Sequence, residues 1–229
     1  MLDGRKFSGK RLPLTVGFAL LLVAAFGAGC KGFFVNPTLT SITINPATPS
    51  VELGSTATLQ AYGVNSNNQG MYLTSGVSWS SSDSTTAAIT GACATAACGS
   101  ATVSGLALGT ATITAASESV TNTATLNVYI TVSTLTITPQ TQSIAAGGTT
   151  AAPYIVTANG NTDISSGAVL TAYTAGGTQQ TTITCTYDAS GAGGAGQYCT
   201  DNGSPTGTYT IVATYTQTTI TAKATLNIT

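Results

Sequence analysis

The sequence contains no histidine and very few charged residues. Of its 229 residues, six are lysine or arginine and seven are aspartate or glutamate. From Cys30 onward the basic residues are Lys31 and Lys223, and six acidic residues bring the formal charge of this part to −4. A protein that binds nucleic acid needs lysine and arginine side chains to replace the counterions of the phosphates. We therefore expect no nucleic-acid partner.

The same scarcity leaves little material for catalysis. The stretch Ser80–Ser82 lacks the histidine that a Ser-His-Asp triad requires. The acidic residues are scattered, whereas glycoside hydrolysis needs two carboxylates about 5–10 Å apart across a cleft. The glycine-rich run Gly191–Gly196 does not follow the pattern of a phosphate-binding loop. The sequence predicts no catalytic residue, no cofactor and no enzymatic activity.

Metal-binding patterns are also missing. Beyond Cys30 the chain has four cysteines, with no Cys-x-x-Cys pair and no histidine, so we expect no zinc site. Asp163, Asp188 and Asp201 have asparagines nearby but do not form an Asp-x-Asp-x-Asp-Gly loop, and calcium takes roughly six to eight oxygen ligands. We interpret these three aspartates as isolated turn residues and predict no metal site.

What the sequence does contain is an internal repeat. Ile44-Asn45-Pro46, Ser50 and Gly54 recur 93 residues later as Ile137-Thr138-Pro139, Ser143 and Gly147. Two later segments recur as well, Gly109–Ile113 as Gly207–Ile211 and Ala124–Val128 as Ala224–Ile228. Self-similarity at a fixed spacing indicates an array of one structural unit. We expect two such units.

Residues 1–29 have the layout of a secretory signal peptide. A basic start is followed by an apolar run from Leu12 to Phe26 and by the small residues Ala28 and Gly29. The position of Cys30 resembles a bacterial lipoprotein signal, in which the cysteine becomes the lipidated first residue, although Gly27 stands where that family usually has leucine. The alternatives are ordinary cleavage or an uncleaved anchor of about 15–18 residues, which is marginal for spanning a bilayer. The resemblance implies an exported protein, held at the membrane by a lipid on Cys30.

Short segments of alternating polar and apolar residues follow this leader. In the first unit they are Leu39–Ile44, Thr56–Tyr62, Val77–Ser80, Thr110–Ala115 and Thr123–Tyr129. Such strands, separated by turn signals about every 8–12 residues, favour an antiparallel β-sandwich. We predict an all-β fold with a tether at residues 30–38 and two tandem domains at residues 39–130 and 131–229.

The first unit resembles a known family. The segments that carry the resemblance are Ile44-Asn45-Pro46, Val51–Gly54, Val77–Asp83 with its Trp-Ser-Ser-Ser-Asp, and Gly109–Ala115 with its Gly-Thr-Ala-Thr-Ile. Together they are similar to the bacterial immunoglobulin-like group 2 family, whose members are immunoglobulin-like sandwiches of surface proteins and serve as spacers or binding modules. The sandwich pattern implies that Trp79 is a core residue. The second unit lacks this tryptophan, and Leu170 or Tyr173 is expected to fill its place.

The four remaining cysteines predict two local disulfides. Cys93 and Cys185 are 92 residues apart, close to the repeat spacing, so each would open an equivalent loop. In an oxidising compartment we expect the pairs Cys93–Cys98 and Cys185–Cys199. The second loop would then be nine residues longer than the first, with Tyr187 and Tyr198 on either side of the run Gly191–Gly196.

These observations lead to one functional hypothesis and one alternative. The hypothesis is a non-enzymatic cell-envelope protein that displays two immunoglobulin-like domains as spacer, structural or adhesion modules. The alternative is a module that binds an extracellular protein or a polysaccharide through the enlarged Cys185–Cys199 loop of the second domain.

Overall fold

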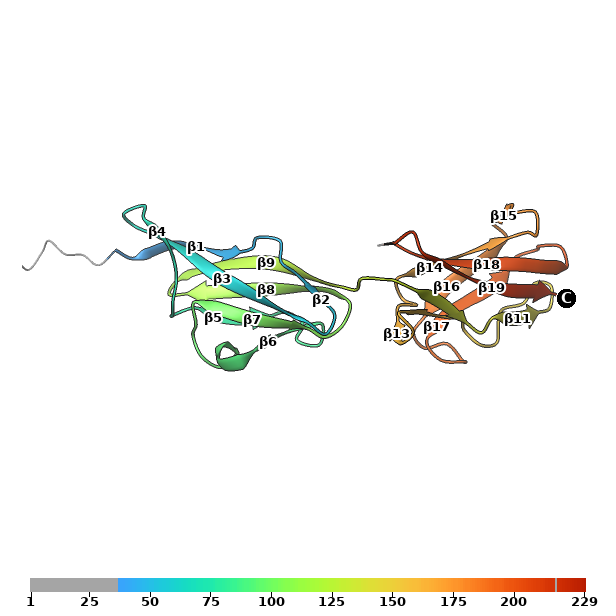
Figure 1. Cartoon of the computed structure of the whole chain (residues 1–229), viewed down its shortest axis with the longest axis horizontal. Helices are drawn as coiled ribbons and strands as arrows, with labels where there is room; N and C mark the ends of the chain where they lie inside the picture. The colour runs from blue at the N-terminus through green and yellow to red at the C-terminus, as the bar shows by residue number, and fades with distance from the viewer. Residues whose placement is uncertain (1–36, 217) are drawn as a thin grey trace, which may run out of the picture. The chain divides into compact units, whose positions relative to one another are not determined.

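The computed structural model describes residues 37–216 and 218–229, which divide into two compact units with the boundary between Val128 and Tyr129. We call these units domain 1 and domain 2. Both consist of β-strands, and the predicted all-β fold is confirmed (Figure 1). The helical element of the described part is one short 3-10 helix, η1, at Gly91–Ala94. Within residues 37–216 and 218–229, no helix is long and apolar enough to cross a membrane.

Domain 1 contains two sheets that enclose its core. Its strands are β1 (Leu39–Asn45), β2 (Ser50–Glu52), β3 (Thr56–Asn65), β4 (Gly70–Tyr72), β5 (Ser78–Ser81), β6 (Ala87–Thr90), β7 (Ser100–Gly105), β8 (Gly109–Ser117) and β9 (Val120–Tyr129). One sheet has the order β1-β3-β7-β6 with β4 also paired to β3, and the other has the order β2-β9-β8-β5. This is the arrangement of a sandwich.

The alternation of residues along the strands builds the core of domain 1. In β8, Ala111, Ile113 and Ala115 are buried, and the threonines between them are at least partly exposed. Leu59 from β3 and Leu126 from β9 are fully buried in the same core cluster. Since burial of apolar surface is the main favourable term in folding, the two sheets are held together chiefly by these inward side chains.

Domain 2 repeats this plan with changes. Its strands are β10 (Leu135–Thr138), β11 (Thr141–Ile144), β12 (Ile155–Ala158), β13 (Thr162–Asp163), β14 (Ala168–Tyr173), β15 (Gln179–Gln180), β16 (Ile183–Asp188), β17 (Gly196–Asp201), β18 (Gly207–Tyr215) and β19 (Thr221–Ile228). One sheet has the order β11-β19-β18-β14-β15. Isolated bridges, Thr149 with Thr200 and Tyr154 with Gln197, connect the ladder β10-β12-β13 to the pair β16-β17 and complete the opposite layer.

Equivalent hydrogen bonds within each domain show which residues of domain 1 correspond to which residues of domain 2. The Gly105 amide donates to the carbonyl oxygen of Ser55 at 3.1 Å, and the Asp201 amide donates to that of Gly148 at 2.9 Å. Ser55 and Gly148 are 93 residues apart, the spacing of the repeat. Gly105 and Asp201 are therefore equivalent, and so are the strand pairs β6-β7 and β16-β17.

This alignment corrects the prediction that the Cys185–Cys199 loop is enlarged. Ala87 pairs with Gly105 and Ile183 with Asp201, and both spans contain 19 residues. Cys93 and Cys98 lie within the connection between strands, whereas Cys185 and Cys199 face each other on the strands themselves. The wider spacing of the second pair reflects its place on a hairpin and not an insertion.

The extra length lies in another part of domain 2. Trp79 pairs with Ala115 and Leu170 pairs with Ala213, the equivalent alanine of the repeat, so Leu170 stands where domain 1 has its tryptophan. The span Trp79–Ala87 holds 9 residues and the span Leu170–Ile183 holds 14. The additional residues form the β14–β15 hairpin, which has no counterpart among the described strands of domain 1.

Candidate functional site

Trp79 lies in the core of domain 1 and not on its surface. Its side chain is 7% exposed and belongs to the core cluster. The indole Nε1 donates a hydrogen bond of 2.9 Å to the carbonyl oxygen of Cys98. A buried tryptophan normally finds such an acceptor for its N–H group. Trp79 therefore supports the Cys93–Cys98 loop, which a disulfide also closes.

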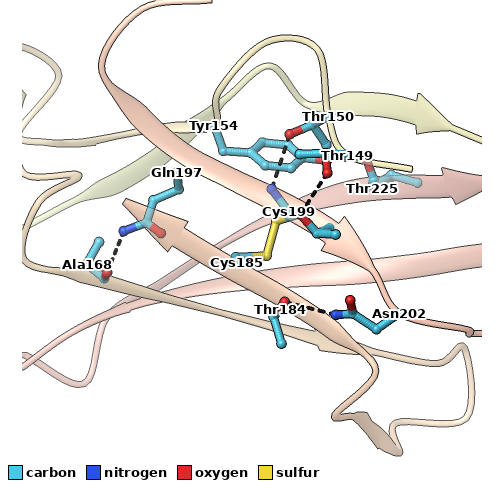
Figure 2. Close-up of a disulfide and its surroundings, with 11 residues drawn as sticks. Thr149, Thr150, Tyr154, Ala168, Thr184, Cys185, Gln197, Cys199, Asn202 and Thr225 are labelled. Atoms are coloured by element: carbon cyan, nitrogen blue, oxygen red, sulfur yellow. Dashed lines mark hydrogen bonds between the residues drawn. A yellow bond between two sulfur atoms is a disulfide. The ribbon is translucent and has the colours of Figure 1, made fainter. Parts of the chain in front are cut away.

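The Cys185–Cys199 disulfide joins β16 to β17 in domain 2, as Figure 2 shows. Cys199 is fully buried, and its amide donates to the Thr150 hydroxyl at 3.1 Å. Thr149 and Thr200 share a hydroxyl hydrogen bond of 2.8 Å beside it. The disulfide region that the sequence suggested as a binding surface is thus tied into the sandwich on one side.

The glycine-rich end of this hairpin is packed by Tyr198. The Tyr198 hydroxyl accepts a hydrogen bond from the Gly193 amide at 2.8 Å and donates one to the Gly194 carbonyl at 2.7 Å. A Cβ atom on Gly191 would lie 2.2 Å from the Tyr198 ring, so the close approach of the ring requires glycine there. Tyr198 serves its own hairpin, whereas Tyr187 remains 40% exposed.

Two buried polar side chains replace apolar residues of domain 1. Strand register places Tyr154 opposite Gln197 and Leu59 opposite Ala101, at equivalent positions. The Tyr154 hydroxyl donates to the Thr225 carbonyl at 2.9 Å, and burial raises its pKa. The Gln197 amide donates to the carbonyls of Ser165 at 2.7 Å and Ala168 at 2.9 Å. The Tyr154 hydroxyl and the Gln197 amide therefore both have hydrogen-bond partners inside domain 2, as buried polar groups usually do. They stabilise the domain rather than bind a ligand.

Asp201 is a buried carboxylate that closes a turn. It accepts hydrogen bonds from the amides of Gly147 at 2.8 Å, Ser204 at 2.7 Å and Gly203 at 3.2 Å. The Gly147 amide is the largest contributor to the lowered pKa of this carboxyl group. Hydrogen bonds of this kind favour the charged form, so Asp201 is a structural anion.

Asp83, in the motif that resembles the family, plays a similar part in domain 1. Its carboxylate accepts hydrogen bonds from the hydroxyls of Thr85 at 2.6 Å and Thr86 at 2.7 Å and from both amides. The Thr85 hydroxyl, followed by that of Thr86, lowers the pKa of Asp83 to about 2. The motif residue therefore orders the turn between β5 and β6.

The other two aspartates also close local turns. Asp163 accepts from the amide and hydroxyl of Ser165, and Asp188 accepts from those of Ser190. Among the described residues, no three His, Cys, Asp or Glu side chains gather where they could hold a metal ion. Cys30, the predicted lipidation site, and residues 1–36 lie outside the described part of the chain.

A groove that the sequence did not suggest lies on the sheet β11-β19-β18-β14-β15. It has a volume of about 370 Å³ and is lined by Tyr173, Thr174, Ala175, Gly177, Thr210, Val212 and Lys223. The inserted β14–β15 hairpin supplies the first four of these residues, and β18 and β19 supply the others. In the sequence, Tyr173 followed by Gly176-Gly177 and Gln179-Gln180 is the signal of that hairpin.

A second groove lies in domain 1, beside β1, β3 and β4. It has a volume of about 340 Å³, and Leu39, Met71 and Leu73 are among the residues that line it. Met71 is 55% exposed. Its lining combines apolar residues with neutral polar residues and Glu118, and none of the lining residues is cationic.

Comparison with known proteins places domain 1 in a class. Residues 38–128 match the family described as bacterial Ig-like domain (group 2). The segment with the two-sheet geometry described above is therefore an immunoglobulin-like sandwich of bacterial type.

One curated relative shares more of the sequence than this family segment. Ice-binding protein 1 of Shewanella frigidimarina (strain NCIMB 400) is 36% identical over 149 residues, which cover 57% of this chain. The match spans 15% of that protein's length.

Solved structures of other proteins are similar to this chain. The adhesin InvE of Yersinia pseudotuberculosis is similar with a TM-score of 0.51 and 16% identity, over 84% of this chain and 58% of that one. Domains 5–6 of the S-layer protein SbsC are similar with a TM-score of 0.36 and 23% identity, over 85% of this chain and all of that one. At these identities the likeness to InvE concerns the fold alone.

Proposed function

We propose that this protein is a non-enzymatic protein of the bacterial cell envelope that presents two immunoglobulin-like domains outside the cell membrane, as structural or adhesion modules. The observation that carries the proposal is the pair of repeated sandwiches, the first of which matches the bacterial Ig-like domain (group 2) family over residues 38–128. The structural neighbour InvE of Yersinia pseudotuberculosis is an adhesin, which supports the adhesion role.

The cysteines support export. Cys93–Cys98 and Cys185–Cys199 are both disulfides in the structure. Disulfides persist in oxidising compartments such as the periplasm and the cell surface. The leader at residues 1–29 supplies the route, and a lipid on Cys30 supplies the anchor.

The hydrogen bonds of the polar side chains support a role without catalysis. The described carboxylates of Asp83, Asp163, Asp188 and Asp201 are engaged with neighbouring amides and hydroxyls. The buried polar groups Tyr154 and Gln197 donate to backbone carbonyls. These side chains stabilise turns and the cores of the two sandwiches, which is a structural role.

The experiment that tests this proposal measures lipidation of Cys30 and attachment of the chain to membranes. Cells that produce the chain are labelled with a palmitate analogue and fractionated, beside cells that produce the Cys30→Ser variant. The wild type should carry label and sediment with membranes, and the variant should lose both properties. Equal labelling and equal distribution of the two forms would contradict the lipid anchor.

A further inference from the structure

The groove of domain 2 lies on the outward face of the sheet β11-β19-β18-β14-β15. Along β14 the side chains alternate, with Leu170 and Ala172 buried and Tyr173 partly exposed. Strand pairing places Tyr173 beside Thr210, and places Lys223 beside Val212 on the next strand. An aromatic ring, a threonine hydroxyl and an ammonium group therefore line one open space of about 370 Å³.

Domain 1 provides an internal control for this arrangement. The aligned registers make Tyr173 equivalent to Ser82, Val212 to Thr114 and Lys223 to Thr123. Only Thr210 keeps its residue type, as Thr112. Domain 1 also lacks the β14–β15 hairpin that supplies Thr174, Ala175 and Gly177 to the wall. The groove is therefore specific to domain 2. The inserted hairpin adds a wall, and Tyr173 and Lys223 stand where domain 1 carries the small hydroxyl side chains of Ser82 and Thr123.

The polar groups of the groove are available to a ligand. Throughout residues 37–216 and 218–229, neither the Tyr173 hydroxyl nor the Lys223 ammonium has a hydrogen-bond or ion-pair partner. Lys223 is exposed, and it is the one lysine or arginine of the described residues. The three aspartates of domain 2 are engaged in their own turns and do not line the groove. A cation without a partner favours an anionic ligand.

We propose that this groove binds a carboxylate-bearing polysaccharide. The face of a sugar ring presents C–H groups that pack on the Tyr173 ring, whose face is electron-rich. The threonine hydroxyls both donate and accept hydrogen bonds, as sugar hydroxyls require. Lys223 pairs with the carboxylate of a uronic acid unit in a charge-assisted hydrogen bond.

The location on a sheet face favours a sugar chain over a peptide. A peptide that adds to a sheet uses free backbone groups at an edge. At the floor of this groove the backbone groups of β14, β18 and β19 already pair with one another. Recognition here must use side chains, and those present match hydroxyl and carboxylate groups.

This inference adds a ligand to the proposed function without depending on it. Binding in solution tests the groove, whereas fractionation of cells tests location and anchoring, so one can fail while the other stands.

The experiment is titration calorimetry of the full chain with oligogalacturonate as the probe and a neutral malto-oligosaccharide of equal length as the control. Oligogalacturonate should bind more tightly, and added salt should weaken it because the pairing with Lys223 is exposed and screened. The variants Tyr173→Ser and Lys223→Thr carry the residues of the equivalent positions in domain 1. Each should lower the affinity about tenfold or more, the effect of losing one favourable contact.

Matched controls keep the result clear. Thr123→Ser, on the equivalent strand of domain 1, should leave binding unchanged. Amide NMR shifts of the wild-type chain give a reading that needs no variant, and they should change on β14, β15, β18 and β19. Absent binding, shifts confined to other strands, or unchanged affinity in both groove variants would overturn the proposal. Equal or tighter binding of poly-glutamate would assign the groove to an acidic peptide and overturn it as well.

Discussion

Leu170 of domain 2 occupies the strand position that Trp79 occupies in domain 1. Each pairs with the same alanine of the repeat, Ala213 or Ala115, and each is buried. In the opposite layer, the buried Tyr154 stands at the position that Leu59 occupies in domain 1. The two cores are therefore filled by different distributions of large side chains on one backbone plan, as close packing requires.

The first prediction concerns Trp79. Trp79→Ala should cost domain 1 about 3–5 kcal/mol, the usual range for truncation of a buried aromatic residue. A domain of this size has about 5–13 kcal/mol of stability. Calorimetric melting should show the transition of domain 1 shifted down or lost and that of domain 2 in place. Leu170→Ala is the matched variant and should shift the other transition. A wild-type melting curve for Trp79→Ala would contradict its place in the core.

The second prediction compares the disulfides. By the chain-entropy model, closing the short Cys93–Cys98 loop stabilises domain 1 by about 2 kcal/mol, and closing the longer Cys185–Cys199 loop stabilises domain 2 by about 3 kcal/mol. In each variant, both cysteines of one pair are replaced by serine, and the free energy of unfolding is measured in urea. The loss of stability should be smaller for the Cys93–Cys98 pair than for the Cys185–Cys199 pair. A larger loss from the Cys93–Cys98 pair would show that loop length does not set the effect.

The third prediction tests the hydroxyl of Tyr154. Tyr154→Phe keeps the ring and removes the donor to the Thr225 carbonyl, so domain 2 should lose about 0.5–1.5 kcal/mol. Tyr154→Ala also removes the ring and should lose about 3–5 kcal/mol. Denaturant unfolding measures both. Equal losses would mean that the hydrogen bond, and not the packing of the ring, carries the contribution.

The fourth prediction is a dependence on pH. Because the pKa of Asp201 is lowered in the folded state, its contribution is complete above the unfolded value of about 3.9 and is lost as pH falls through the folded value. Asp201→Asn should destabilise domain 2 at pH 7 and flatten its loss of stability in acid. Thermal melts between neutral pH and pH 2 measure this. An acid profile of domain 2 identical in wild type and variant would contradict the role of the carboxylate.

Much of the fold could be predicted because its signals are local. The alternation in Leu39–Ile44 and Thr110–Ala115 depends on neighbouring residues, and both segments are strands. The family motif and the repeat identified the kind of sandwich. The proposed ligand groove could not be predicted, because it requires the register of Tyr173 against Thr210 and of Val212 against Lys223. Such register is set by cross-strand hydrogen bonds between distant segments.

The error about the Cys185–Cys199 loop has the same origin. Spacing between cysteines counts residues along the chain and does not show which of them lie on paired strands. The pairing of Ile183 with Asp201 shows that the span is no longer than its counterpart in domain 1. The insertion lies instead at the β14–β15 hairpin, which contains no cysteine, so cysteine spacing could not reveal it.

The most direct test of the account is the accessibility of the chain on intact cells. A peptide tag placed after Thr229 is probed with antibody and with added protease before and after the cells are opened, with a cytoplasmic protein as the control. The cells either lack an outer membrane or have it permeabilised. The account predicts that both reagents reach the tag while the cytoplasmic control stays protected. It also predicts that cysteines 93, 98, 185 and 199 do not react with an alkylating reagent. A tag that is reached only after lysis of the inner membrane, with those four cysteines free, would contradict it.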